Sequence, residues 1–126
     1  MIKDLKNKNI YVIGGCGLIG SDVVKRFKKI SKKIIVVDEI LKLSSNKVKY
    51  TKFDVNNSFE IEKRFNNFFL KNGVPDVMIN CSYPKSKNWD ELSFDNYEMN
   101  TINQNIDYHL KSFLNFSYFF ANFMRQ

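Results

Sequence analysis

The chain has 126 residues, 44% of them hydrophobic, which suffices for one folded domain with a core but is small for a two-lobed enzyme. Its two cysteines are too few for a disulfide framework, and no segment is apolar enough to cross a bilayer or to act as a signal core, so we expect a cytoplasmic protein with reduced thiols. The net charge of +7, with many lysines in residues 1–33 and no interleaved aromatic residues, favours a solvated surface over a face that binds nucleic acid or another polyanion.

The first predicted unit is a strand, a glycine loop and a helix within residues 10–30. A β-branched and aromatic run leads into Gly14, Gly17 and Gly20, and apolar residues then recur at helical spacing with lysines between them. In dinucleotide-binding folds the first glycine turns the backbone, the middle one admits a pyrophosphate, and the last lets the helix lie close to its strand. We therefore expect a diphosphate at the start of this helix, with an ordinary glycine turn as the alternative.

Residues 32–37 predict a buried second strand, and Asp38 follows it directly. A carboxylate at this position can accept hydrogen bonds from both hydroxyls of an adenosine ribose and would repel a 2′-phosphate. The sequence therefore predicts NAD rather than NADP as the cofactor. The alternative is an ordinary aspartate that starts a turn.

Strand and helix patterns alternate at short spacing through the rest of the chain. The expected elements are a third strand over 48–53 closed by Asp54 and Val55, a helix over 59–70 with Asn57 or Ser58 as its cap and Gly73 at its end, and a fourth strand over 76–80. This alternation predicts an α/β fold, a doubly wound parallel sheet of the Rossmann type, incomplete, with about four strands and flanking helices.

A polar segment follows the fourth strand, and the pattern becomes helical again from Ser93 in two segments. In the polar segment, Lys85 and Lys87 are candidates for contact with a substrate phosphate or for simple solvation. The last helical segment, residues 110–123, is apolar on more than one face. One face can cover the sheet, and we expect the other to meet a partner chain, with a homo-oligomer through this helix as one arrangement, or to meet sequence that would normally follow.

These motifs resemble the N-terminal half of a short-chain dehydrogenase/reductase. The resemblance rests on residues 13–20, Asp38, Asp54 with Val55, and residues 76–80, and the glycine spacing looks most like the extended branch of epimerases and dehydratases. Residues 80–85 and 105–114 resemble the flagellin-modification and nonulosonic-acid members, bacterial oxidoreductases that act on sugar intermediates of surface glycans. The resemblance implies that residues 1–126 form a single NAD(P)-binding domain, the N-terminal portion of a longer fold.

The resemblance also implies cofactor contacts, residue by residue. It assigns the pyrophosphate to Gly14, Gly17 and Gly20 above Leu18 and Ile19, the ribose to Asp38, the adenine to Asp54 and Val55, and the nicotinamide ribose side to Asn80 and Cys81. His109 stands where many members carry a catalytic Asn. As a lone histidine without a cysteine or carboxylate cluster it predicts no metal site, and it either is satisfied within its helix or faces the cleft.

Besides His109, two features depart from the family pattern. Cys81, Ser82 and Tyr83 replace the rest of an Asn-Asn-Ala-Gly segment, so a small position beside the nicotinamide ribose becomes bulky. Ile13 replaces a threonine whose hydroxyl braces the loop. Cys16 lies near a helix start, where a thiol can become reactive, although a small loop side chain is the simpler interpretation.

The proton-transfer residues of the family have no counterpart in this sequence. Family chemistry uses a Ser and a Tyr-x-x-x-Lys pair, in which the ammonium lowers the pKa of the phenol. Tyr83 and Lys87 have this spacing but directly follow a strand, and we interpret the match as chance. We therefore expect no dehydrogenase turnover from this polypeptide alone, and a non-catalytic dinucleotide-binding or sensor module and a basic polyanion-binding protein are the alternative functions.

Overall fold

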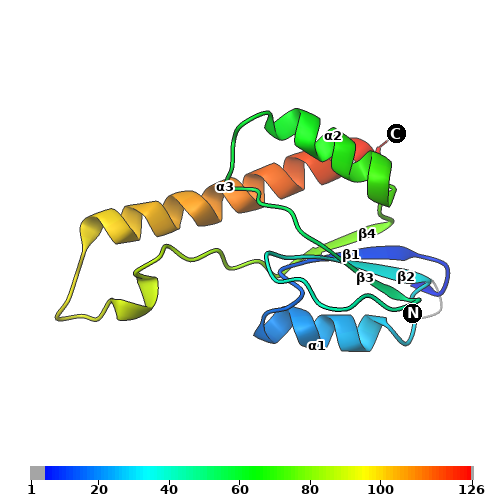
Figure 1. The fold of residues 1–126 in the computed structure, drawn as a ribbon, viewed down its shortest axis with the longest axis horizontal. Helices are drawn as coiled ribbons and strands as arrows, with labels where there is room; N and C mark the ends of the chain where they lie inside the picture. The colour runs from blue at the N-terminus through cyan, green and yellow to red at the C-terminus, as the bar shows by residue number, and fades with distance from the viewer. Residues whose placement is uncertain (1–4, 126) are drawn as a thin grey trace.

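The computed structural model describes residues 5–125, which form one parallel sheet with helices on both of its faces (Figure 1). The strands are β1 (Asn9–Ile13), β2 (Lys33–Val37), β3 (Val48–Thr51) and β4 (Val77–Asn80). The helices are α1 (Leu18–Phe27), α2 (Ile61–Asn72) and α3 (Met99–Met124), with a short 3₁₀ helix, η2 (Trp89–Glu91). The expected α/β class and the doubly wound parallel sheet of about four strands are confirmed.

The strand order is β3-β2-β1-β4, and all three pairings are parallel. In β1, Ile10 lies opposite Ile34 of β2 on one side and Val77 of β4 on the other. Residues 10–13 and 34–37 are at most 2% exposed, because helices cover both faces of the sheet. The chain leaves β1 toward β2 and β3 and later returns to β4 on the other side, so the strand order reverses next to β1. In open α/β sheets, ligands bind at this point, beyond the carboxyl ends of the strands.

Alternate residues of the strands feed two separate cores. On the face that α1 covers, Ile10 and Val12 pack with Val24 and Val36. On the opposite face, α2 and α3 supply an aromatic layer, in which the ring centroids of Phe65 and Phe119 lie 4.3 Å apart. The two-residue period of β1 therefore assigns each of its side chains to one helix layer.

Tyr11 places a polar hydroxyl group in the aromatic core, where it has a hydrogen-bond partner. Its ring packs edge-on against Phe68 and Phe120, and its hydroxyl donates a 2.5 Å hydrogen bond to the carbonyl oxygen of Gly73. Burial raises the pKa of this phenol, so it stays protonated and keeps its donor. The bond joins the centre of the sheet to the C-terminal end of α2.

The boundaries of several elements differ from those expected. β3 ends at Thr51, and α2 begins at Ile61, after Glu60 in the left-handed conformation (φ 45°), with no side-chain cap from Asn57 or Ser58. Phe59 therefore lies outside the helix and is 73% exposed. Two helical segments were expected after Ser93, but the structure has one: α3 runs unbroken for 26 residues from Met99. Residues 93–98, expected at the start of the first segment, are irregular.

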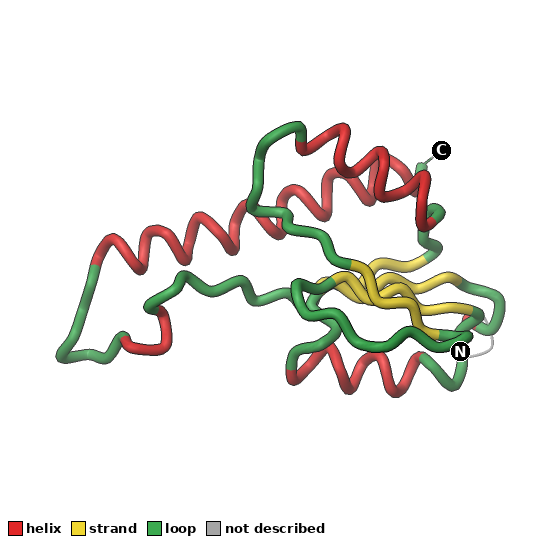
Figure 2. The backbone as a smooth tube through the Cα atoms, in the orientation of Figure 1, coloured by secondary structure: helices red, strands yellow, loops and turns green. Residues whose placement is uncertain are grey.

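The N-terminal part of α3 extends past the sheet, beside the long loop that follows β4 (Figure 2). Ser86 fastens this loop to the helix: its N–H donates to Asn105 Oδ1 at 2.9 Å, and its hydroxyl donates to the carbonyl oxygen of Thr101 at 3.4 Å. Several apolar residues of α3 are largely exposed, namely Ile106, Leu110, Phe113, Leu114 and Tyr118, as expected for a helix with more than one apolar face. None of the helices in residues 5–125 has both the length and the hydropathy of a membrane span.

Candidate dinucleotide-binding site

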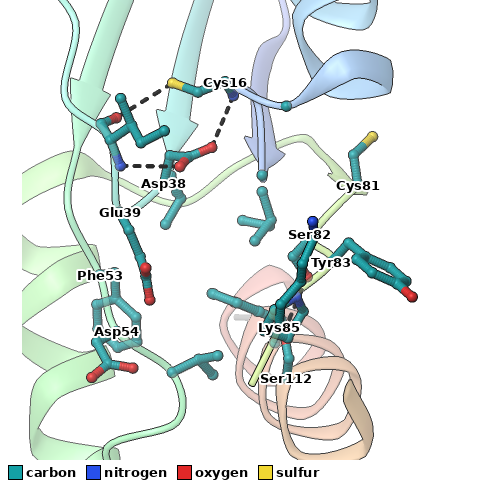
Figure 3. A pocket seen from close by; sticks show the side chains of 18 of the residues that line it. Cys16, Asp38, Glu39, Phe53, Asp54, Cys81, Ser82, Tyr83, Lys85 and Ser112 are labelled. Carbon is teal, nitrogen blue, oxygen red and sulfur yellow. Dashed lines mark hydrogen bonds between the residues drawn. The ribbon is translucent and has the colours of Figure 1, made fainter. Parts of the chain in front are cut away.

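An open cleft of about 980 Å³ lies at the carboxyl ends of the strands. It is bounded by the glycine loop after β1, the segments that follow β2, β3 and β4, and one face of α3. Figure 3 shows Asp38 and Asp54 on one side of this space and Ser82 and Lys85 on the other. The residues lie far apart in the sequence, and the parallel sheet brings them together at one edge.

The glycine loop is closely packed on its protein side. Gly14 has a positive φ of 70°, and a Cβ there would lie 2.7 Å from the backbone nitrogen of Ser82. A Cβ on Gly20 would lie 2.1 Å from the carbonyl oxygen of Gly14. At both positions the backbone therefore requires glycine, and the close approach of α1 to β1 expected from Gly20 is present.

The other side of the loop is open. A Cβ on Gly17 would have the carbonyl oxygen of Gly14, at 3.5 Å, as its nearest neighbour. No side chain caps the start of α1, where Leu18 and Ile19 line the cleft and are 92% and 71% exposed. The free N–H groups and the positive end of the helix dipole thus face the cleft, an arrangement that suits an anion.

Asp38 joins the glycine loop to the segment after β2. Its Oδ2 accepts a 2.8 Å hydrogen bond from the N–H of Cys16, and its Oδ1 accepts a 3.1 Å bond from the N–H of Ile40. Figure 3 shows both bonds. These two bonds hold the carboxylate in place at the cleft. Each oxygen retains a further acceptor site, so the carboxylate can still accept hydrogen bonds from a diol.

Cys16 does not have the character of a reactive thiol. Its Sγ donates to the carbonyl oxygen of Ile40 at 3.3 Å. Burial raises the pKa of this thiol, and the negative charge of Asp38 raises it further. The simpler interpretation, a small loop side chain, agrees with this geometry.

Asp54 and Val55 lie across the cleft from the glycine loop. Asp54 Oδ1 accepts hydrogen bonds from the N–H groups of Asn56 and Asn57 at 2.9 and 3.3 Å, a turn of the type that aspartate commonly forms. Val55 is 7% exposed and belongs to the aromatic core while lining the cleft. Both residues therefore border the cleft on the side opposite the glycine loop.

The end of β4 carries a small polar network. Asn80 Oδ1 accepts bonds from the N–H and hydroxyl of Ser82 at 3.0 and 2.6 Å, and the Ser82 hydroxyl lies 3.0 Å from that of Ser112 on α3. Asn80 itself lies behind the cleft lining, whereas Cys81 lines it, and burial raises the pKa of the Cys81 thiol. The backbone of Cys81 and Ser82 lies directly against Gly14.

His109 does not line the cleft. Its ring packs edge-on against Tyr83 at 4.3 Å, and its Nε2 is buried without a hydrogen-bond partner among the described residues. The helix instead directs Tyr108 and Ser112 to the cleft. Neither of the two expected states of His109, satisfied within its helix or facing the cleft, is found here. Tyr83 and Lys87 lie in a loop, as expected for a chance match to the family pair.

Sequence reasoning missed several residues of the cleft: Glu39, Ile40, Phe53, Asn56, Tyr108, Ser112 and Phe116. Those after β2 and β3 could have been found from their place beyond strand ends. The residues from α3 could not, because the rotation of that helix about its axis is set by packing. Within residues 5–125 no cluster of three or more histidine, cysteine or carboxylate side chains could hold a metal ion.

Solved structures of other proteins share this arrangement of strands and helices. A short-chain dehydrogenase from Leptospira borgpetersenii with bound NAD+ superimposes with a TM-score of 0.75 at 23% identity, over 95% of this chain and 47% of the other. The aldohexose dehydrogenase of Thermoplasma acidophilum gives 0.75 at 22% identity, over 97% and 46%. The chain has the fold of the short-chain dehydrogenases.

Sequence comparison adds one relative with a described role. The post-translational flagellin modification protein A of Campylobacter coli is 26% identical over 137 aligned residues, which cover 97% of this chain and 52% of that protein. No protein-family model matches the sequence. The chain thus spans about half the length of the short-chain dehydrogenases and of the flagellin-modification relative.

Proposed function

We propose that this chain binds NAD and forms the cofactor-binding part of a short-chain dehydrogenase. The observation that carries the proposal is Asp38. Its carboxylate is anchored to the glycine loop through the Cys16 N–H, beside the uncapped start of α1. A diphosphate at the helix start would place the attached ribose next to this carboxylate, which can accept from both ribose hydroxyls.

The arrangement that we propose for the whole dinucleotide is the one that the family resemblance implies, and most of the residues concerned line the cleft. The pyrophosphate lies over Gly14, Gly17 and Gly20 beside Leu18 and Ile19, the adenine between Asp54 and Val55, and the nicotinamide half runs toward Asn80 and Cys81. NAD is preferred to NADP because a 2′-phosphate would meet the carboxylate of Asp38. The NAD+-bound Leptospira enzyme, which shares the fold, supports this choice of cofactor.

The substrate that we propose is a sugar phosphate or nucleotide sugar in bacterial surface-glycan biosynthesis, oxidised or reduced at a carbon bearing a hydroxyl. The flagellin-modification relative and the aldohexose dehydrogenase support a sugar derivative. Lys85 lines the cleft and forms an exposed ion pair with Asp90 at 2.8 Å, so its ammonium stands where a substrate phosphate could replace the carboxylate.

We also propose that residues 1–126 are one NAD-binding domain, the N-terminal portion of a longer fold, and that the apolar surface of α3 serves a partner or a second copy. The catalytic Ser and the Tyr-x-x-x-Lys pair of the family would come from elsewhere in that longer fold. A purified chain should therefore bind NAD without oxidising a substrate.

The test is a calorimetric titration of the chain with NAD, NADP and ADP-ribose. We expect saturable binding of NAD and ADP-ribose, weaker binding of NADP, and loss of binding in Gly17→Val. Incubation of chain and NAD with sugar phosphates and nucleotide sugars should give no NADH absorbance. Salt-sensitive binding of nucleic acid without NAD affinity would instead support the polyanion-binding function.

A non-catalytic dinucleotide sensor is the second candidate. The position of His109 favours it, because the residue at the family's catalytic Asn position does not line the cleft and packs behind Tyr83, which does. A sensor would bind NAD and NADH with different affinities and would change its association with a partner on binding. A longer gene product that reduces NAD in the presence of a sugar would exclude this candidate.

A further inference from the structure

One arginine contacts most of the segment that lines the adenine side of the cleft. Arg64, in the first turn of α2, donates from Nη2 to the carbonyl oxygen of Asp54 at 2.6 Å and from Nη1 to that of Asn57 at 2.5 Å. Its guanidinium carbon also lies 4.9 Å from the centre of the Phe53 ring. A single side chain thus holds both ends of residues 53–57.

The partners of Arg64 are themselves fixed. Phe53 packs against Phe65 and Phe68, with ring centroids 4.5 and 5.2 Å away, so the surface on which the guanidinium rests belongs to the aromatic core. The backbone N–H of Arg64 donates to the carbonyl oxygen of Glu60 at 2.9 Å. Arg64 therefore relates the turn to α2 through both its side chain and its main chain.

The two hydrogen bonds from the Arg64 guanidinium fix the turn that holds the Asp54 carboxylate. Asn57 is held at its carbonyl by Arg64, and its N–H donates to Asp54 Oδ1 together with the N–H of Asn56. Oδ1 is thereby occupied, and the described residues provide no hydrogen bond to Oδ2. The other carboxylate oxygen remains an acceptor for a ligand that lies in the cleft.

We propose that Arg64 is a positioning residue for base recognition: by forking onto the two carbonyl oxygens it orients Asp54 so that Oδ2 accepts from the exocyclic amine of adenine. This inference rests on the proposed NAD site and deepens it. Arginine suits the role because its planar fork meets two acceptors and stacks on Phe53 at the same time, whereas a lysine ammonium is a point charge that does neither well.

The experiment compares two dinucleotides that differ only at the base. Hypoxanthine carries a carbonyl oxygen in place of the adenine amine, so at this position it presents to Asp54 an acceptor instead of a donor, and its N1–H lies one ring atom away. We expect the wild-type chain to bind NAD about tenfold or more tightly than nicotinamide hypoxanthine dinucleotide, as a lost hydrogen bond to a charged acceptor implies. In Arg64→Met the two affinities should converge to within about threefold, and Arg64→Lys should converge nearly as far.

The ratio of the two affinities separates positioning from simple loss of stability. A merely structural arginine would lower both affinities together and leave their ratio unchanged. Lys71→Met, a matched loss of one positive charge in the last turn of α2, should keep the wild-type ratio. Circular dichroism shows which variants are folded, and Arg64→Lys carries the test if Arg64→Met is not.

Each failure has a distinct meaning. If the wild-type chain binds neither dinucleotide, the proposed function is wrong and this inference falls with it. If it binds both equally, or if a folded Arg64 variant keeps the preference for adenine, the role of Arg64 is wrong while the NAD site stands.

Discussion

The glycine loop allows a paired test in which stability and binding separate. In Gly20→Ala the new Cβ would lie 2.1 Å from the carbonyl oxygen of Gly14, whereas real Cβ contacts stay beyond 3.0 Å. Gly14 would have to retreat by the difference, 3.0 − 2.1 = 0.9 Å. Its N–H is bonded to the carbonyl oxygen of Val37 at 2.8 Å, and its other side rests on Ser82, so this retreat is resisted.

The magnitude follows from two opposing effects. Forcing a methyl group into a filled space costs about 3 kcal/mol, and replacing a helical glycine by alanine returns about 1 kcal/mol. We expect Gly20→Ala to lower the free energy of unfolding by about 2 kcal/mol, and Tm by roughly 6–10 °C for a domain of this size. Because the displaced loop no longer presents its N–H groups correctly, NAD affinity should fall as well.

Gly17→Ala should behave differently. Its backbone, with φ −71° and ψ 178°, is accessible to alanine, and the nearest atom to the new Cβ lies at an ordinary 3.5 Å. The free energy of unfolding should change by less than about 1 kcal/mol. The methyl group would nevertheless stand where the pyrophosphate approaches, so the Kd for NAD should rise about tenfold or more.

The assay is thermal denaturation followed by circular dichroism, together with calorimetric titration of NAD. Gly73→Ala is the matched control, because its Cβ meets open space and its backbone (φ 84°, ψ 170°), which essentially only glycine adopts, costs alanine roughly 1–3 kcal/mol without touching the cleft. NAD binding to Gly17→Ala with wild-type affinity would refute the pyrophosphate position. An unchanged Tm in Gly20→Ala would refute the close approach of α1 to the loop.

Three further outcomes follow from the structure. Asp38→Asn should weaken NAD binding about tenfold and narrow the preference for NAD over NADP, because the amide lacks the charge that repels a 2′-phosphate. If titrations with both cofactors give the variant the same ratio of affinities as the wild type, this role of Asp38 is wrong. The pKa of Asp76 is lowered from 3.8 by the Asn9 N–H and by the Lys8 ammonium, so the stabilisation is present above that pH and is lost as the pH falls through the lowered pKa. The free energies of urea unfolding of wild type and Asp76→Asn should therefore differ at pH values well above 3.8, and the difference should shrink as the pH falls below 3.8; a constant difference would show that ionisation is not its source. Since the pKa of Cys16 is raised above its ordinary 9.0, its alkylation by iodoacetamide should keep accelerating above that pH, whereas a plateau near neutrality would reveal a thiolate.

The existence and type of the main elements could be predicted because each depends on local chemistry. A continuous apolar run such as residues 34–37 is compatible with burial in a parallel strand, and Gly14 and Gly20 occupy positions where the backbone leaves no room for a side chain. The boundaries were less accurate. The start of α2 was placed too early because Asn57 and Ser58 have the chemistry of helix caps, yet the chain uses Asn57 to bond the N–H of Phe59 and then turns through Glu60.

Part of the site could also be predicted, since Asp38 and Asp54 directly follow or close predicted strands. The position of His109 could not. A helix of this length buries whichever stripe best fits the aromatic core, and the fit of Phe116 and Phe120 turns Ser112 toward Ser82 and leaves His109 against Tyr83. Arg64 was equally inaccessible, because its partners are carbonyl oxygens whose directions no sequence pattern records.

The sequence by itself determined that a strand, a glycine loop and a helix follow one another and that acidic residues end the neighbouring strands, because these depend on steric demands and hydrogen bonds between residues close in the chain. The tertiary structure alone decided that the carboxylate of Asp38 accepts a hydrogen bond from the Cys16 N–H and that Arg64 donates to two carbonyl oxygens on the opposite side of the cleft. It also decided which face of α3 lines the cleft. These choices depend on contacts between distant segments, and their geometry is set only once the strands have paired in register and the two cores have closed around them.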